Sequence, residues 1–261
     1  MLYFIIELQE RNSDLFYFGL ICLILALTFL FLTGRSKIKV LGVNAWFKPF
    51  KFAFSTFLFS WAMGWYCFYL ADFNANLFNW SIIVLLGFEI LYIAIQAGKG
   101  QLSHFNISTP LYSILYSLMG LAAAIVSLYT GFVGLLFFTQ SFPDLPDYYV
   151  WSIRMSIFIF VVFSFQGFLM GSRMNHSVGA LNNNSNWFIV GWSKTVGDLR
   201  VSHFIGMHAL QVLPFVSFYL FKNTPATILF SAFYGLLATA TLIQALKGRP
   251  VFKSNKNKVV T

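Results

Sequence analysis

The sequence predicts an all-α polytopic membrane protein, a helix bundle of seven transmembrane helices with the N-terminus outside and the C-terminus in the cytoplasm. Three observations carry this prediction. Hydrophobic residues make up 58% of the 261 positions and charged residues only 10%, which is too apolar for a soluble domain. Apolar runs recur at the length of about 20 residues that a helix needs to cross a hydrocarbon core. Lys and Arg gather in alternate loops between these runs.

Seven apolar runs are the predicted spans. Backbone groups in lipid must pair within their segment, and no run alternates polar and apolar residues as a barrel strand does, so each is expected to be a helix. The runs cover residues 14–33, 48–71, 77–97, 110–138, 148–171, 199–221 and 224–246. The fourth is long enough to tilt or to break near Gly131 and Gly134. Thr109 and Pro110 mark its capped start, and Asp198 is the expected cap of the sixth.

The positive charges set the orientation. Fourteen of the seventeen Lys and Arg fall on one side of the predicted bilayer, whereas Arg11 and Lys222 fall on the other and Arg154 lies inside the fifth run. By the positive-inside rule the first side is cytoplasmic, which requires an odd number of spans. Residues 1–250 are therefore expected to form one transmembrane domain, and residues 251–261 a short basic cytoplasmic tail.

All four histidines fall toward the predicted cytoplasmic side. His203 and His208 lie in the inner half of the sixth run, while His104 and His176 follow the third and fifth runs. Five residues along a helix correspond to about 140° of rotation and about 7.5 Å of rise, so both rings of the sixth run do not easily reach one ion. Gln211 lies between them in angle. The three side chains form a polar arc that is expected to face the bundle interior or a wet cavity.

Glu89 is the only carboxylate near the middle of a predicted span. A charge that is so costly to bury is a functional-site candidate, and a protonated or paired structural acid is the simpler alternative. Its expected cationic neighbour is Arg154, unless that side chain extends outward to the membrane surface. Gln166 and Gln244 lie in the inner parts of the fifth and seventh runs. Together these residues predict a polar pocket that opens to the cytoplasm.

The longest loop, residues 172–198, is expected to lie over this pocket as a lid. Loops of this length are usually functional or disordered, and its tryptophans suit the membrane interface. For its Asn-rich part, a floppy connection is the alternative. Arg200 lies at the start of the sixth helix, where the positive dipole end also favours an anion such as a phosphate, a carboxylate or a haem propionate.

The segment GDLRVSHFIGMHALQVLP, residues 197–214, resembles a segment of an uncharacterised family of bacterial polytopic membrane proteins, and SHFN at 103–106 is similar to the same family. The resemblance implies a multi-pass protein of the bacterial inner membrane and no particular activity. Two other seven-helix classes fit less well. Residues 224–246 contain no lysine to bind retinal, and the H-x-x-x-H pair of the ceramidase and adiponectin-receptor type of zinc hydrolase is replaced by H-x-x-x-x-H.

The first of three open functions is a metal or haem site. Histidine is the commonest metal ligand. The candidate ligands are His203, His208, His104 and His176. A haem b needs one histidine on each face of its ring, and Arg200, Arg173 and Gln211 would then lie around the cofactor. If the metal were zinc with an open position, a bound water would be activated, with Glu89 or Asp198 as the candidate catalytic base.

The second function is a proton-coupled transporter or permease, in which Glu89, His203 and His208 act as relay or gating groups. No inverted repeat is visible, and an odd number of helices differs from the commoner transporter designs. The third is a sensor or assembly protein without a catalytic site. The lipid bilayer is the expected partner. The positive charges lie in loops rather than in a nucleic-acid patch, and a small-molecule or lipid substrate stays open.

Overall fold

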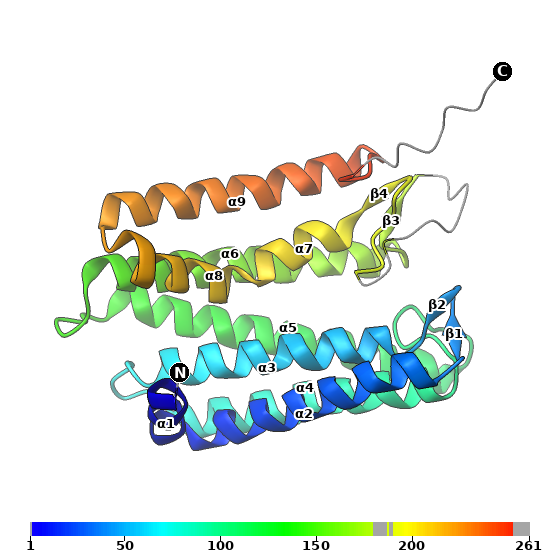
Figure 1. The fold of residues 1–261 in the computed structure, drawn as a ribbon, viewed down its shortest axis with the longest axis horizontal. Helices are drawn as coiled ribbons and strands as arrows, with labels where there is room; N and C mark the ends of the chain where they lie inside the picture. The colour runs from blue at the N-terminus through cyan, green and yellow to red at the C-terminus, as the bar shows by residue number, and fades with distance from the viewer. Residues whose placement is uncertain (1, 180–186, 188–189, 253–261) are drawn as a thin grey trace.

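The computed structural model describes residues 2–179, 187 and 190–252, and most of them are helical. Figure 1 shows the long helices running back and forth along the long axis of the molecule. The helices are α1 (Leu2–Arg11), α2 (Ser13–Arg35), α3 (Phe47–Cys67), α4 (Ala75–Gly98), α5 (Pro110–Thr139), α6 (Asp147–Ser172), α7 (Leu199–Met207), α8 (Ala209–Val216), the π-helix η1 (Ser217–Phe221) and α9 (Thr224–Leu246). All seven predicted apolar runs are helical, and the sixth consists of α7, α8 and η1 together.

Several helices have the length and apolarity of membrane spans. In the described residues these are α2, α4, α5, α6 and α9, and α7 with α8 and η1 adds a sixth if this bent pair is one span. Helix α3 is 21 residues long but is not among them. Its Lys48 and Lys51, with several Ser, Trp and Tyr residues, lower its apolarity. The fold is thus an all-α bundle of the multi-pass membrane type, and a span at 48–71 stays a prediction.

Helix α6 joins two groups of helices. On one side it packs on α5, and α2, α3, α4 and α5 pack on their chain neighbours. On the other side it packs on α7, α8 and α9. The larger group encloses the main core, which includes the fully buried Phe78, Met63 and Phe137, while Ala209 and Leu213 lie in a smaller core against α6 and α9.

The outward faces of the helices remain apolar. Leu27 on α2, Leu135 on α5 and Leu229 on α9 are 58%, 63% and 73% exposed. Soluble monomers rarely expose apolar side chains over so much of their surface. These faces are therefore suited to contact with lipid tails.

Helix α5 continues without interruption through the glycines at which a break was considered. A Cβ at Gly134 would lie 2.6 Å from Ile157 of α6, and one at Gly131 would lie 3.5 Å from Val161. These glycines allow close packing of α5 on α6 instead of breaking α5. The expected caps are confirmed, because Thr109 accepts a hydrogen bond from the Tyr112 N–H and Asp198 accepts one from the Arg200 N–H.

Three short elements at the ends of the bundle were not predicted from the sequence. Helix α1 lies across one end (Figure 1), where Phe4 stacks on Trp65 at 4.9 Å between ring centroids. At the other end, β1 (Lys39–Val40) pairs antiparallel with β2 (Val43–Asn44). The turn between them has positive φ angles at Leu41 and Gly42, which matches a tight hairpin turn.

The sixth predicted span is bent by 45° between α7 and α8, near His208. Pro214 lacks a backbone N–H, so the carbonyl of Leu210 one turn earlier has no helical partner. The hydroxyl of Tyr66 on α3 donates to this carbonyl at 2.5 Å. The freed backbone group is thereby satisfied without water, as a protein in lipid requires.

Candidate functional site

Asp198 and Arg200 form a clamp at the start of α7. Asp198 is 2% exposed and caps the helix, because its Oδ1 accepts from the Arg200 N–H at 3.1 Å. The Arg200 guanidinium donates to both carboxylate oxygens, at 2.9 and 2.6 Å, and Oδ2 also accepts from the Ser193 N–H. Burial alone would raise the pKa of Asp198, but Arg200 and the Ser193 N–H outweigh it and hold the pKa below its usual value. A carboxylate so fully engaged is suited to holding structure rather than to accepting a proton.

The described part of the loop predicted to be a lid is tied to two helices. Strand β3 (Ser177–Val178) pairs antiparallel with β4 (Gly197–Asp198), at the same end of the bundle as β1 and β2 (Figure 1). The Lys51 ammonium on α3 donates to the Val190 carbonyl at 3.0 Å, and Arg200 donates to the Gly191 carbonyl. The Asn-rich stretch 182–184 and Phe188 lie outside the described residues.

The two histidines of the bent span are both anchored through Nδ1. His203 Nδ1 lies 2.7 Å from the Phe163 carbonyl of α6, and His208 Nδ1 lies 2.8 Å from the Phe204 carbonyl one turn earlier. The absence of a side chain at Gly167 makes room for the His203 ring, since a Cβ there would lie 3.1 Å from its Cε1. A carbonyl can only accept, so each Nδ1 carries its proton and each Nε2 keeps a free lone pair.

The other two histidines lie on the loops at the same end. His104 packs near the Tyr116 ring, and burial together with the charges of Lys48 and His203 holds the pKa of His104 well below its usual value. Burial and then the charge of Arg200 lower the pKa of His176 to about 4. Both imidazoles are therefore neutral at pH 7. Their electrostatic neighbours place them around the same cluster of cations as the Asp198 clamp.

Glu89 is buried in α4 with 3% of its surface exposed, and its Oε1 has no hydrogen-bond partner in the described part of the chain. The charge that acts on it is that of Lys48, at the start of α3. The expected neighbour Arg154 lies elsewhere, because its Nε donates to the Phe137 carbonyl at the end of α5. The seven-residue offset puts Gln96 on the same face of α4 as Glu89. Gln96 is 1% exposed.

Three buried glutamines have side-chain acceptor atoms without a hydrogen-bond partner. The Oε1 atoms of Gln96, Gln166 and Gln211 find no hydrogen-bond partner among the described residues. Such atoms are uncommon in folded proteins, because each retains the full cost of its desolvation. Gln166 also donates to the Leu199 carbonyl at 3.4 Å. The open acceptors lie on α4, α6 and α8, which are three of the four helices from which the pocket was predicted.

Two other predicted site residues stand apart from this cluster. Arg173 is exposed at the C-terminal end of α6, and its side chain makes no hydrogen bond or ion pair with the described residues. Gln244 donates to the Pro250 carbonyl at 2.7 Å and so holds the segment that follows α9 against the end of this helix. Within the described ranges, no three His, Cys, Asp or Glu side chains are close enough together to hold a metal ion.

Lys48 is the site residue that the sequence argument missed. From the sequence, Lys48 was predicted only to be one of the positive charges at the membrane surface. Lys48 and Lys51 are, however, three residues apart on one helix face. This spacing could have indicated that the two lysines act at one site. Its charge interacts with Glu89, Arg200 and Lys51, and it therefore belongs to the cluster at this end of the bundle. We refer to Lys48, Glu89, His104 and His203, with the Asp198 clamp, as the inner polar cluster.

The fold and this cluster define a class, that of multi-pass helical membrane proteins with ionisable side chains inside the bundle. Comparisons of the chain with protein-family models, curated proteins and solved structures found no match. The resemblance of residues 197–214 to a bacterial membrane family therefore stays a prediction.

Proposed function

We propose that this protein is a proton-coupled transporter of a small solute in the bacterial inner membrane, with seven spans, an outside N-terminus and a cytoplasmic C-terminus. The observation that carries the proposal is Glu89, a carboxyl group 3% exposed, with an oxygen that has no partner among the described residues. A carboxyl group inside a span destabilises the protein, so its presence usually indicates a function, and proton relays are a frequent one. The charge of Lys48 acts on Glu89 and can stabilise the carboxylate after it releases its proton.

The bent span supports the same class of function. Transporters often bind solutes and ions where a spanning helix is interrupted, because the interruption exposes backbone groups and polar side chains inside the membrane. The bend near His208 lies one turn from Gln211, whose Oε1 has no partner in the described residues. The interruption and the open polar atoms therefore occur together. Helix α3 serves as the seventh span in this proposal, between α2 and α4.

The charges of the cluster favour an anionic solute. Arg200 is neutralised by Asp198, whereas Lys51 donates only to a neutral carbonyl and Lys48 makes no hydrogen bond to the described residues. When Glu89 is protonated, its carboxylate no longer offsets the positive charge that the two lysines carry. A solute carboxylate or phosphate would compensate it, and proton binding at Glu89 would then favour anion binding.

The test is proton flux in proteoliposomes that contain a pH-sensitive dye. A membrane potential is imposed, and acetate, lactate, inorganic phosphate, glutamate and uncharged sugars are added in turn. The expected result is solute-dependent proton movement with one of the anions, reduced by Glu89→Gln to the level of empty liposomes. Glu10→Gln, which changes an exposed acid on α1, is the matched control and should leave the flux unchanged. Flux that persists in Glu89→Gln, or no flux with any of these solutes, would overturn the proposal.

A second candidate function is haem or metal binding, and one observation favours it. The Nδ1 anchors of His203 and His208 leave each Nε2 as a free lone pair, which is the tautomer that metal-binding histidines adopt. His203 and His104 interact electrostatically and would be the pair for a haem b. An absorption spectrum of purified protein before and after dithionite, with metal analysis, tests this. A Soret band lost in His203→Ala supports haem, and a colourless, metal-free protein contradicts both cofactors.

The same variants distinguish the third function, a sensor or assembly protein, from the transporter and the haem or metal protein. If Glu89→Gln and His203→Ala affect only thermal stability, while flux and metal content are absent in the unchanged protein, a non-catalytic role is favoured.

A further inference from the structure

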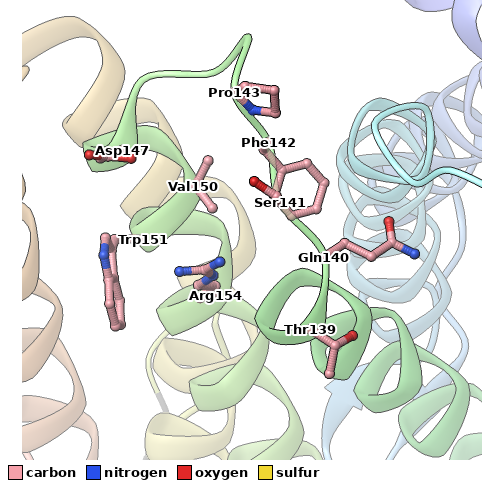
Figure 2. A pocket seen from close by; sticks show the side chains of 9 residues that line it. All are labelled: Thr139, Gln140, Ser141, Phe142, Pro143, Asp147, Val150, Trp151 and Arg154. Atoms are coloured by element: carbon pink, nitrogen blue, oxygen red, sulfur yellow. The ribbon is translucent and has the colours of Figure 1, made fainter.

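At the opposite end of the bundle from the inner polar cluster, the turn between α5 and α6 lines an open cavity of about 300 Å³. Figure 2 shows the Arg154 side chain within its lining, with Trp151 on one side and the turn residues on the other. Thr139 at the end of α5, Gln140 and Ser141 in the turn and Asp147 at the start of α6 complete the polar part of the lining.

Arg154 is fixed in this cavity but only partly satisfied. Its Nε donates to the Phe137 carbonyl at 2.7 Å, and its guanidinium carbon lies 5.4 Å and 5.2 Å from the ring centroids of Phe138 and Trp151. These contacts fix the orientation of the guanidinium plane. No hydrogen bond of its two terminal nitrogens occurs among the described residues, and the side chain is only partly buried where it lines the cavity. A guanidinium held in this way matches the geometry of phosphate oxygens.

Asp147 lies on the same face of α6, seven residues before Arg154, yet the two form no ion pair in the described structure, whose pairs are Glu7 with Arg11 and Asp198 with Arg200. Seven residues correspond to about 10 Å of helix rise, with Asp147 nearer the end of the bundle. The cavity thus offers a cation deeper in the membrane and an anion nearer the water. A phospholipid headgroup with a phosphate and a terminal amine has the opposite charges in the same order.

We propose that this cavity binds the headgroup of an amine-bearing zwitterionic phospholipid, with the phosphate on Arg154 and the ammonium directed to Asp147. Phe138 is 49% exposed on the adjoining surface and offers an apolar contact for an acyl chain. Trp151 is of the type that lines the membrane interface. A free phosphate would satisfy Arg154 but would leave Asp147 facing a second anion, so the lipid is the better match for both charges.

The test is native mass spectrometry of the intact protein in mild detergent with phosphatidylethanolamine, phosphatidylglycerol or inorganic phosphate. The unchanged protein should retain phosphatidylethanolamine in preference to phosphatidylglycerol, and millimolar inorganic phosphate should not displace it. Arg154→Gln should reduce the retention of both lipids about tenfold, in keeping with the loss of a charge-assisted hydrogen bond. Asp147→Asn, at an exposed position, should remove only the preference for the amine.

The matched control is Lys222→Asn, which removes a positive charge from the same end of the bundle outside the cavity. Lys222 is exposed and has a left-handed backbone conformation that Asn tolerates. Equal lipid retention in Arg154→Gln and the unchanged protein would overturn the proposal. Displacement by inorganic phosphate, or an unchanged preference in Asp147→Asn, would identify a simple anion site and overturn the lipid assignment.

Discussion

At the scale of single residues, the polar side chains of the bundle differ in how completely they are paired. Near one end, Asn12 and Asn79 exchange hydrogen bonds at 3.0 and 2.9 Å, and the Asn12 Oδ1 also caps α2. Glu89 has an open oxygen deep in α4. Paired groups hold helices in register, whereas open groups retain an unmet cost of desolvation. This difference in hydrogen bonding sets Glu89 apart from the paired Asn12 and Asn79.

Tyr66→Phe should destabilise the protein by about 1 to 3 kcal/mol, because the Leu210 carbonyl freed by Pro214 would lose its only described donor while it remains buried. Thermal unfolding in detergent measures the change. Tyr219→Phe alters an exposed tyrosine near the same span and should have little effect. Equal shifts in the two variants would contradict this account of the bend.

His176 should make the loop at the start of α7 sensitive to acid. Its pKa is about 4 in the fold against an ordinary value of 6.5, so folding favours the neutral form. This contribution to stability is complete above about pH 6.5 and is lost as the pH falls toward 4. Arg200, Lys48 and Lys51 repel the protonated ring, and Asp198 opposes them.

Hydrogen–deuterium exchange of a peptide that covers residues 190–200, corrected for intrinsic rates, measures this effect at pH 7.5 and pH 5. The unchanged protein should lose protection at pH 5. His176→Gln should lose less, and an identical loss in both proteins would show that His176 is not the group that titrates.

At the scale of elements, glycines determine how closely neighbouring helices approach. Gly206 of α7 faces the ring of Phe163 on α6, and a Cβ there would overlap it. Gly120 of α5 has nothing within 4 Å in the described structure. The first glycine is required by packing, whereas the second is not.

Gly206→Ala should therefore destabilise the bundle by about 1 to 3 kcal/mol through overpacking, and Gly120→Ala should be neutral or stabilising by up to about 1 kcal/mol. Apparent melting temperatures of both variants in the same detergent provide the comparison. A stable Gly206→Ala would mean that α7 shifts freely on α6.

The elements also show where sequence reasoning succeeds. Helix limits follow from local chemistry, so Pro110 with its cap Thr109, and Asp198 before α7, could be identified in advance. Helix α1 and the hairpin at Lys39–Asn44 could not, because short elements depend on partners far along the chain, such as Trp65 for α1. The electrostatic interaction of Glu89 with Lys48, in place of the expected Arg154, was missed for the same reason, since depth in the membrane alone does not determine which helices face each other.

At the scale of the whole molecule, the orientation in the membrane can be measured with cysteine labelling. Cys22 and Cys67 are 0% and 2% exposed, so the background is low. Cysteine at the exposed Asp144 should react with a membrane-impermeant maleimide in intact cells, because the α5–α6 turn is expected outside. Cysteine at the exposed Lys99 should react only after permeabilisation. The reverse pattern would invert the proposed topology.

The bend near His208 has a mechanical consequence for the molecule. Helix α8 is fastened to α3 through Tyr66, whereas α7 packs on α6 and α9 and bears the strand and loop that reach Lys51. The two halves of the sixth span are thus held by different partners, α8 by Tyr66 and α7 by α6, α9 and the loop bound to Lys51. Rotation of α7 about the bend would have to break both the Lys51 contact with the Val190 carbonyl and the His203 contact with the Phe163 carbonyl, so these two bonds together determine how easily this half of the span moves.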